Sequence, residues 1–418
     1  MLRRFALLVL LVAGAAHAAA QAAASFFIES IEVAGGSRAT DHIIIAESRL
    51  RLMQEYTEGD LRNAVARIQR LPFIVSTDFR LEKGTQVGRY VLLIRVRRMT
   101  PLFLDSETTS TWSERVVGPP VGSTDPTVSH VLRRLDDNHV VAGARAFLGA
   151  NIVATATAEK RSFQNDRYTL TFSKYDLFGS RASLTAILSY SQYPCCLRSG
   201  APDAENDWHH RDNITEELVA VVPVTDTDSL RGSWQHYEFP VRFNERSPET
   251  GQFHYVLLSR PEITKDLVWI HDTTNDPLLP TEGTRWTFGG TRVETVSQTG
   301  TGYSLAENRQ FDVSWERSFP VTFHGMETQS LTIGGSGQQI NRILQLFRPF
   351  ATYAFDLPHP LYGGDVRLQI SGWKQFSRIR QRPMPLVTSQ GSLAAGIIYR
   401  NVWGVLRLNL EYDGWERP

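Results

Sequence analysis

Long stretches of the chain alternate between apolar and polar side chains. Near the C-terminal end, the apolar positions Leu406, Leu408, Leu410 and Tyr412 are separated by polar or charged ones. A period of two residues indicates a strand with one apolar and one polar face. The same alternation recurs at 183–190, 311–316 and 366–371. So many amphipathic strands predict a mainly β protein that closes into a barrel, with its apolar side turned inward in a soluble protein or outward to lipid in a membrane.

The N-terminal end indicates export. Arg3 and Arg4 precede a short apolar stretch at 5–15, and Ala16-His17-Ala18 forms a small-residue cleavage site. This pattern predicts a secretory signal peptide at 1–18. No later run reaches the roughly 18 uninterrupted apolar residues that a membrane-spanning helix needs. If the chain crosses a membrane, we expect it to do so with strands.

Residues 26–98 follow a different pattern, that of a small α+β unit. Thr57 can cap a helix with Asp60 three residues on, and Pro72 ends that helix. The other expected elements are a strand at 28–33, a helix at 41–53, and strands at 75–82 and 89–97. We expect an irregular linker at 99–139, rich in Gly and Pro at its centre, with an early strand or a plug as the alternative for part of it. The remaining residues, 140–418, have room for about 12–16 barrel strands.

The segment 26–98 resembles a POTRA domain, the periplasmic module of outer-membrane assembly proteins. The resemblance rests on Ile31-Glu32-Val33-Ala34-Gly35-Gly36, on Tyr56-Thr57-Glu58-Gly59-Asp60-Leu61, on Ile68-Gln69-Arg70-Leu71-Pro72-Phe73, and on the closing strand at 90–96. It implies that this unit lies in the periplasm and contacts a partner there.

Two turns and the terminal hairpin are similar to those of BamA/TamA-type barrels. The first turn is Tyr175-Asp176-Leu177-Phe178-Gly179-Ser180, and the second runs from Asp272 to Gly283. The turn residues carried over as structural are Asp176, Phe178, Gly179, Asp272, Asn275, Pro280, Thr281 and Gly283. The resemblance implies a sixteen-stranded transmembrane antiparallel barrel in the bacterial outer membrane, preceded by one POTRA domain. It also implies help with the insertion, assembly or translocation of client proteins, without a cofactor or a metal.

The resemblance further implies a weak seam between the first and last barrel strands. We take the last strand as the seam candidate, with Gly404, Leu406, Leu408, Leu410 and Tyr412, and expect its partner at about 140–150. The family's Arg-Gly-aromatic element is not found between Ser318 and Arg400. This departure keeps a second hypothesis open, a passive pore or structural barrel without assembly activity.

Composition and motifs argue against several other classes of function. Lys plus Arg (44) balance Asp plus Glu (44), so no net charge favours nucleic acid. The two cysteines, Cys195 and Cys196, are adjacent and form no disulfide framework. His209 and His210 lack the helical i, i+4 spacing of a metal site. No catalytic signature is present, and an outer-membrane enzyme is the least favoured hypothesis.

Overall fold

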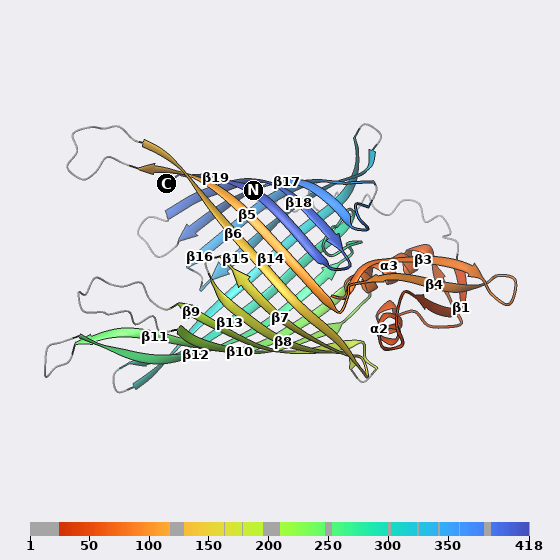
Figure 1. Cartoon of the computed structure of the whole chain (residues 1–418), viewed down its shortest axis with the longest axis horizontal. Coiled ribbons are helices and arrows are strands. Elements are labelled where there is room, and N and C mark those ends of the chain that lie inside the picture. Colours follow the sequence, from red (N-terminus) through yellow and green to blue (C-terminus); the bar gives the residue numbers. More distant parts are fainter. Residues whose placement is uncertain are drawn as a thin grey trace, which may run out of the picture.

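The computed structural model describes residues 25–117, 129–162, 164–177, 179–194, 210–246, 253–299, 302–323, 326–341, 343–358, 360–379 and 386–417. The predicted signal peptide at 1–18, the turn residue Phe178, the cysteines Cys195 and Cys196, and His209 lie outside these residues. Figure 1 shows a small α/β unit at one end of a large barrel. No helix in the described ranges is long and apolar enough to span a membrane.

The N-terminal unit, residues 25–98, is a four-stranded sheet with two helices. Its elements are β1 (Ser25–Ala34), α2 (Arg38–Ser48), β2 (Gln54–Thr57), α3 (Glu58–Gln69), β3 (Ile74–Lys83) and β4 (Arg89–Arg98). The strand order is β2-β1-β4-β3, which leaves β2 and β3 at the edges. The core of the unit is fully buried and includes Ile28, Ile44, Ile68, Phe73 and Ile94.

The predicted local signals account for most of this unit. The backbone N–H of Asp60 donates to the Thr57 hydroxyl, and the Asp60 carboxylate accepts from the backbone N–H of Thr57. This capping box begins α3 as predicted. The first helix is shorter than predicted, because Arg49 adopts a left-handed conformation with φ 58° and ends it. Strand β2, which the sequence pattern did not predict, follows.

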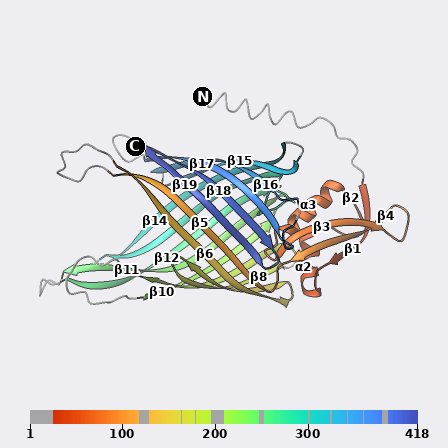
Figure 2. The ribbon, with the colours of Figure 1, turned by 45° about the horizontal axis from the view of Figure 1, so that its top comes forward.

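The barrel is built from fifteen strands among the described residues. They are β5 (Leu102–Val117), β6 (Ser129–Gly149), β7 (Ile152–Arg161), β8 (Gln164–Leu177), β9 (Ala182–Pro194), β10 (His210–Pro223), β11 (Asp228–Arg246), β12 (Phe253–Asp272), β13 (Gly283–Thr299), β14 (Gly302–Phe323), β15 (Met326–Ile340), β16 (Leu344–Asp356), β17 (Asp365–Ile379), β18 (Leu386–Asn401) and β19 (Gly404–Arg417). Each strand pairs with its neighbours in the chain, and β19 closes the barrel against β5. The strands are strongly tilted relative to the long axis of the barrel (Figure 2).

The closure corrects two expectations. In the part of the chain that the structure describes, the barrel has fifteen strands rather than sixteen. An odd number of up-and-down strands makes the closing pair parallel, and β19 and β5 do pair in parallel. The other barrel pairs are antiparallel. The segment 99–139, predicted as a linker, contains β5 and the first part of β6, so the partner of the last strand is not the segment 140–150.

Strand β5 escaped the sequence pattern because its polar residues do not alternate. After Leu102 and Leu104, the same face of the strand continues with Ser106, Thr108 and Ser110. The opposite face is also largely polar, so no period of two is visible. In the structure β5 pairs with β19 on one side and with β6 on the other.

An apolar belt surrounds the outside of the barrel. Large apolar side chains at alternate strand positions are exposed, among them Phe288 (60%), Phe311 (54%) and Leu410 (62%). The intervening positions carry polar networks toward the lumen, where Gln310 and Gln338 both donate to Asp312. Apolar side chains facing out and polar ones facing in are the arrangement of a barrel that spans a bilayer. Of the two arrangements that the sequence allows, the structure shows the membrane type.

Candidate functional site

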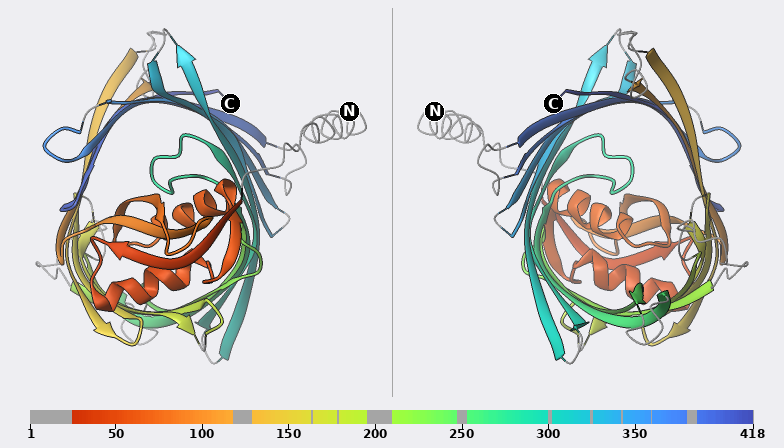
Figure 3. Two further views of the ribbon diagram at one scale, coloured as in Figure 1. Left: turned by 90° about the vertical axis from the view of Figure 1, so that its right-hand side faces the viewer. Right: turned by 90° about the vertical axis from the view of Figure 1, so that its left-hand side faces the viewer.

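The N-terminal unit is docked against one mouth of the barrel. Viewed along the barrel, the unit and the turn between β12 and β13 lie across the opening (Figure 3). Both sequence-predicted turns, at 175–180 and 272–283, lie at this end, beside the helices of the unit. The contacts between the unit and the barrel rim are therefore the first part of the candidate site. They fall into three groups.

Arginines of the two helices make the first group of contacts. Arg49, just after α2, donates to the carbonyl of Thr225 and pairs with Asp226 in the turn between β10 and β11. Arg67 of α3 lies 3.8 Å from the same carboxylate. Its side chain is 4% exposed and also donates to the carbonyl of Ser48. The turn at 223–228 is thus held by two guanidinium groups of the unit.

Arg70 makes the second group, with the predicted turn at 272–283. It lies 3.1 Å from the Asp272 carboxylate and donates to the carbonyls of Asp272 and Thr274, each at 3.0 Å. Phe73 extends this contact, because its ring packs edge-on against Phe147 at 5.1 Å between centroids. The core of the unit therefore continues into the inner wall of the barrel.

Arg97 makes the third group, at the far side of the mouth. It donates to the Asp365 carboxylate at 2.8 Å and to the carbonyl of Gly363 at 2.8 Å. Asp365 also lies 3.4 Å from Arg400 of β18. A single carboxylate at the start of β17 therefore links the N-terminal unit to the lumenal wall.

Burial shifts the pKa of two side chains at the junction where the unit meets the barrel rim. Glu47 of α2 faces the cavity of about 280 Å³ between the unit and the rim. Burial raises its pKa above the ordinary value, although Arg49, Arg67, Arg70 and Arg181 act in the opposite direction. Burial also lowers the pKa of Arg67 to about 10, so this guanidinium remains charged at neutral pH.

The turn at 272–283 is organised by the residues that the sequence singles out. The Asp272 carboxylate accepts from the backbone N–H and the hydroxyl of Thr274. The side-chain amide of Asn275 donates to the Thr281 hydroxyl at 2.7 Å and accepts from its backbone N–H at 3.0 Å. Gly283 has φ 108°, and a Cβ there would lie 2.4 Å from the carbonyl oxygen of Thr273. Glycine is therefore required where the turn enters β13.

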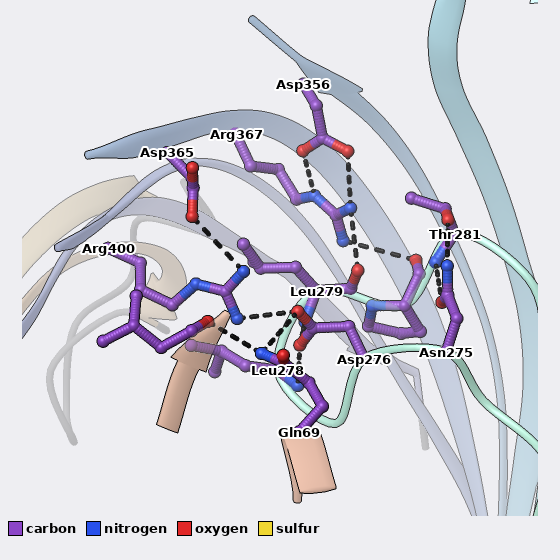
Figure 4. Close-up of polar contacts among 12 residues, drawn as sticks. Gln69, Asn275, Asp276, Leu278, Leu279, Thr281, Asp356, Asp365, Arg367 and Arg400 are labelled. Carbon is purple, nitrogen blue, oxygen red and sulfur yellow. Dashed lines mark hydrogen bonds and ion pairs between the residues drawn. The ribbon is translucent and has the colours of Figure 1, made fainter. Parts of the chain in front are cut away.

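Two lumenal arginines clamp this turn to the opposite wall (Figure 4). Arg367 of β17 forms a two-pronged pair with Asp356, at 2.6 and 2.7 Å. The same guanidinium donates to the carbonyls of Leu279 and Pro280 at 3.1 and 3.3 Å. Arg367 is 4% exposed, so its charge is satisfied entirely by these partners.

Arg400 holds the other half of the turn. It donates to the Asp276 carboxylate at 2.7 Å. The second oxygen of that carboxylate accepts the backbone N–H groups of Leu278 and Leu279. Gln69 of α3 reaches Asp276 from the unit at 3.5 Å. Unit, turn and lumenal wall are joined in one network.

The first predicted turn is tight and left-handed. Asp176 has φ 53° and Gly179 has φ 67°, and the Asp176 carboxylate accepts from the backbone N–H of Arg181. A Cβ on Gly179 would meet no atom within 4 Å, so only its backbone conformation favours glycine. This turn lies next to Arg49 and Asp226, at the same junction.

The closing pair β19–β5 is the second part of the candidate site. The seam residues lie in β19, with Leu406, Leu408 and Leu410 opposite Ser106, Thr108 and Ser110, and Tyr412 opposite Trp112. Leu406, Leu408, Leu410 and Tyr412 are all exposed on the outside. Because residues opposite each other in a pair share a face, the three β5 positions also belong to the outer face, where Ser110 is 7% exposed and its hydroxyl donates to Asp136. The apolar belt is interrupted at the seam.

Backbone hydrogen bonds hold the seam together at the end that lies beside the N-terminal unit. The backbone N–H of Thr100 donates to the carbonyl of Val402, and that of Leu104 to the carbonyl of Trp403. Gly404 has φ 144°, and a Cβ there would lie 2.0 Å from the carbonyl oxygen of Leu104. The chain therefore contacts the last hairpin, β18–β19, directly after it leaves the N-terminal unit.

The comparisons give low similarity. No protein-family model matches the chain, and no curated protein matches it. Among solved structures, it is similar to BamA from Haemophilus ducreyi lacking POTRA domains 1–3, with 9% identity, a TM-score of 0.42, and coverage of 90% of this chain and 80% of that one. It is also similar to CdiB from Acinetobacter baumannii, with 11% identity, a TM-score of 0.46, and coverage of 93% and 74%. The siderophore receptor PirA from Acinetobacter baumannii matches at 9% identity and a TM-score of 0.34, with coverage of 85% and 62%. Similarities of this size say nothing about what the chain does.

Proposed function

We propose that this chain is an outer-membrane β-barrel protein of the BamA/TamA type that assists the insertion or translocation of other proteins. In this proposal the N-terminal unit is a POTRA domain in the periplasm, where it meets a periplasmic partner, and the apolar belt lies in the outer membrane. The proposal needs no cofactor, metal or enzymatic step. It is supported by the resemblance of the sequence motifs and by the seam.

The seam is the observation that carries the proposal. Leu408 and Leu410 face lipid on one side of it, whereas on the other side Thr108 presents a hydroxyl, and Ser110 is buried with its hydroxyl donating to Asp136. Lipid packs poorly against hydroxyl groups, because they find no hydrogen-bond partner in hydrocarbon. An incoming strand would pair with the backbone groups of β19 or β5 after these strands separate, and among the described strands they form the parallel pair of the barrel. Parallel pairing is slightly less stable per residue than antiparallel pairing.

The unit offers an edge for an extended client. Strand β3 is at the edge of the sheet, and an extended segment can add to it through backbone hydrogen bonds. The sequence also allows 28–33 as such an edge. That segment belongs to β1, which is paired with β2 at its start and with β4 along its length. Strand β3 is therefore the better candidate.

The passive pore remains the second candidate. The missing Arg-Gly-aromatic element between Ser318 and Arg400 favours it. The position of the unit and of the turn at 272–283 across the mouth speaks against a freely open channel (Figure 3). The two candidates differ in what the barrel does for other proteins.

Reconstitution distinguishes them. The full mature chain is placed in liposomes, a urea-denatured outer-membrane barrel protein is added, and its folding is followed by its altered gel mobility without heating. We expect folding several times faster than with empty liposomes. A matched variant with Cys195 and Cys196 replaced by serine and with Thr108→Cys and Leu408→Cys, oxidised to cross-link the seam, should lose this gain and recover it on reduction. Equal folding with and without the chain, together with steady ion conductance in a planar bilayer, would favour the pore.

A further inference from the structure

A second polar cavity, of about 530 Å³, lies where the N-terminal unit meets the barrel rim. Three arginines line it: Arg49 and Arg51 from the segment after α2, and Arg181 from the turn between β8 and β9. Among the described residues that line it, the acidic one is Asp226, which already contacts Arg49 and Arg67. The cavity therefore has an excess of positive charge.

Two of these guanidinium groups, those of Arg51 and Arg181, make no hydrogen bond or ion pair in the described part of the chain, although Arg181 acts electrostatically on Glu47. The backbone of each of the two residues does make a hydrogen bond. Arg49 is 10% exposed, and its Nε is buried without a hydrogen-bond partner. Guanidinium groups that converge and outnumber the carboxylates in their cavity are suited to a phosphate group, which accepts several of their N–H donors at once.

The surroundings indicate an amphiphilic ligand. Val224 lines the same cavity and is 66% exposed. Val222 and Leu184 are exposed on the adjoining strands, at the lower end of the apolar belt. The arginines thus lie just below the belt, at the level where lipid headgroups meet the end of the barrel that carries the unit. Basic pockets at this level bind phosphorylated headgroups in other membrane proteins.

We propose that Arg49, Arg51 and Arg181 form a phosphate-binding site that takes the headgroup of an anionic phospholipid from the leaflet next to the N-terminal unit. The bound phosphate bridges the unit, through Arg49 and Arg51, and the barrel, through Arg181. The lipid then strengthens the docking of the unit on the rim. This inference does not depend on assembly activity.

The test uses the full mature chain in a neutral detergent. Binding of phosphatidylglycerol is titrated by native mass spectrometry, and inorganic phosphate is titrated separately. The test variant carries Arg51→Gln and Arg181→Gln, and it leaves Arg49 in its contact with Asp226. The matched control carries Arg95→Gln and Arg309→Gln, two exposed arginines elsewhere on the molecule. Unheated gel mobility checks that each variant has folded.

We expect the test variant to bind phosphatidylglycerol at least tenfold more weakly than the original chain, and the control to bind it unchanged. If neither protein binds phosphatidylglycerol and the test variant loses the binding of inorganic phosphate, the phosphate site is supported and its ligand is a soluble phosphate. Equal binding of both ligands by the test variant and the original chain would overturn the proposal.

Discussion

Leu408 of the last strand lies opposite Thr108 of the first barrel strand, in a parallel register. One side chain is suited to lipid and the other is not, although both point outward at the same height. The pair marks the line along which the two ends of the barrel meet. It is also where the sequence pattern and the structure differ most.

Disulfide cross-linking tests this register. With Cys195 and Cys196 replaced by serine, Leu408→Cys and Thr108→Cys should form a disulfide in most molecules, since residues opposite each other across a pair lie close enough. The measurement is the mobility shift on a non-reducing gel. Leu408→Cys with Val140→Cys is the control, because β5 lies between these strands. A cross-link in the control pair and none in the first would show that β5 does not close the barrel.

Removing Gly283 should destabilise the turn at 272–283. Gly283→Ala places a Cβ 2.4 Å from the carbonyl oxygen of Thr273 at φ 108°. We expect a loss of about 1–3 kcal/mol in the free energy of unfolding. Gly179→Ala is the matched control, since its Cβ meets open space at φ 67° and should cost only about 1 kcal/mol. Urea unfolding followed by tryptophan fluorescence measures both, and equal losses would contradict the contact at Gly283.

The sequence predicted the turns better than it predicted what holds them. Asn275, Thr281 and Gly283 stand out in the sequence because their roles are local, within one turn. The contacts of Arg70 and Arg97 join segments some two hundred or more residues apart, so no spacing in the sequence reveals them. The arginines that face the lumen also occupy polar positions of alternating strands, so the sequence pattern does not distinguish them from other polar residues.

Replacing Arg367 should release the turn from the lumenal wall. Arg367→Met removes the pair with Asp356 and leaves that carboxylate without its partner, at a cost on the order of 3 kcal/mol. Adding Asp356→Asn should recover part of the loss. Arg134→Met, at an exposed pair with Asp136, should cost less than about 1 kcal/mol. The readout is the rate of proteolytic cleavage within 272–283, and unchanged cleavage in Arg367→Met would show that Arg367 does not hold the turn.

The docking of the unit should weaken as Glu47 ionises. Its pKa is raised by burial at the junction, so the docked state is favoured fully below the ordinary carboxyl pKa. This contribution is lost as the pH rises through the raised value. Glu47→Gln stays neutral and should keep the unit docked over that range. Hydrogen exchange of α2 between pH 4.5 and 7 measures the difference, and the same pH dependence in both proteins would argue against a role for Glu47.

Depletion of the protein in its own host tests the proposed assembly role most directly. The outer-membrane fraction is quantified by proteomics before and after depletion, and again after the original chain is restored. The proposal predicts loss of a defined set of barrel or surface proteins, accumulation of their precursors in the periplasm, and recovery on restoration. An outer-membrane proteome unchanged by depletion would contradict it and leave the passive barrel as the function.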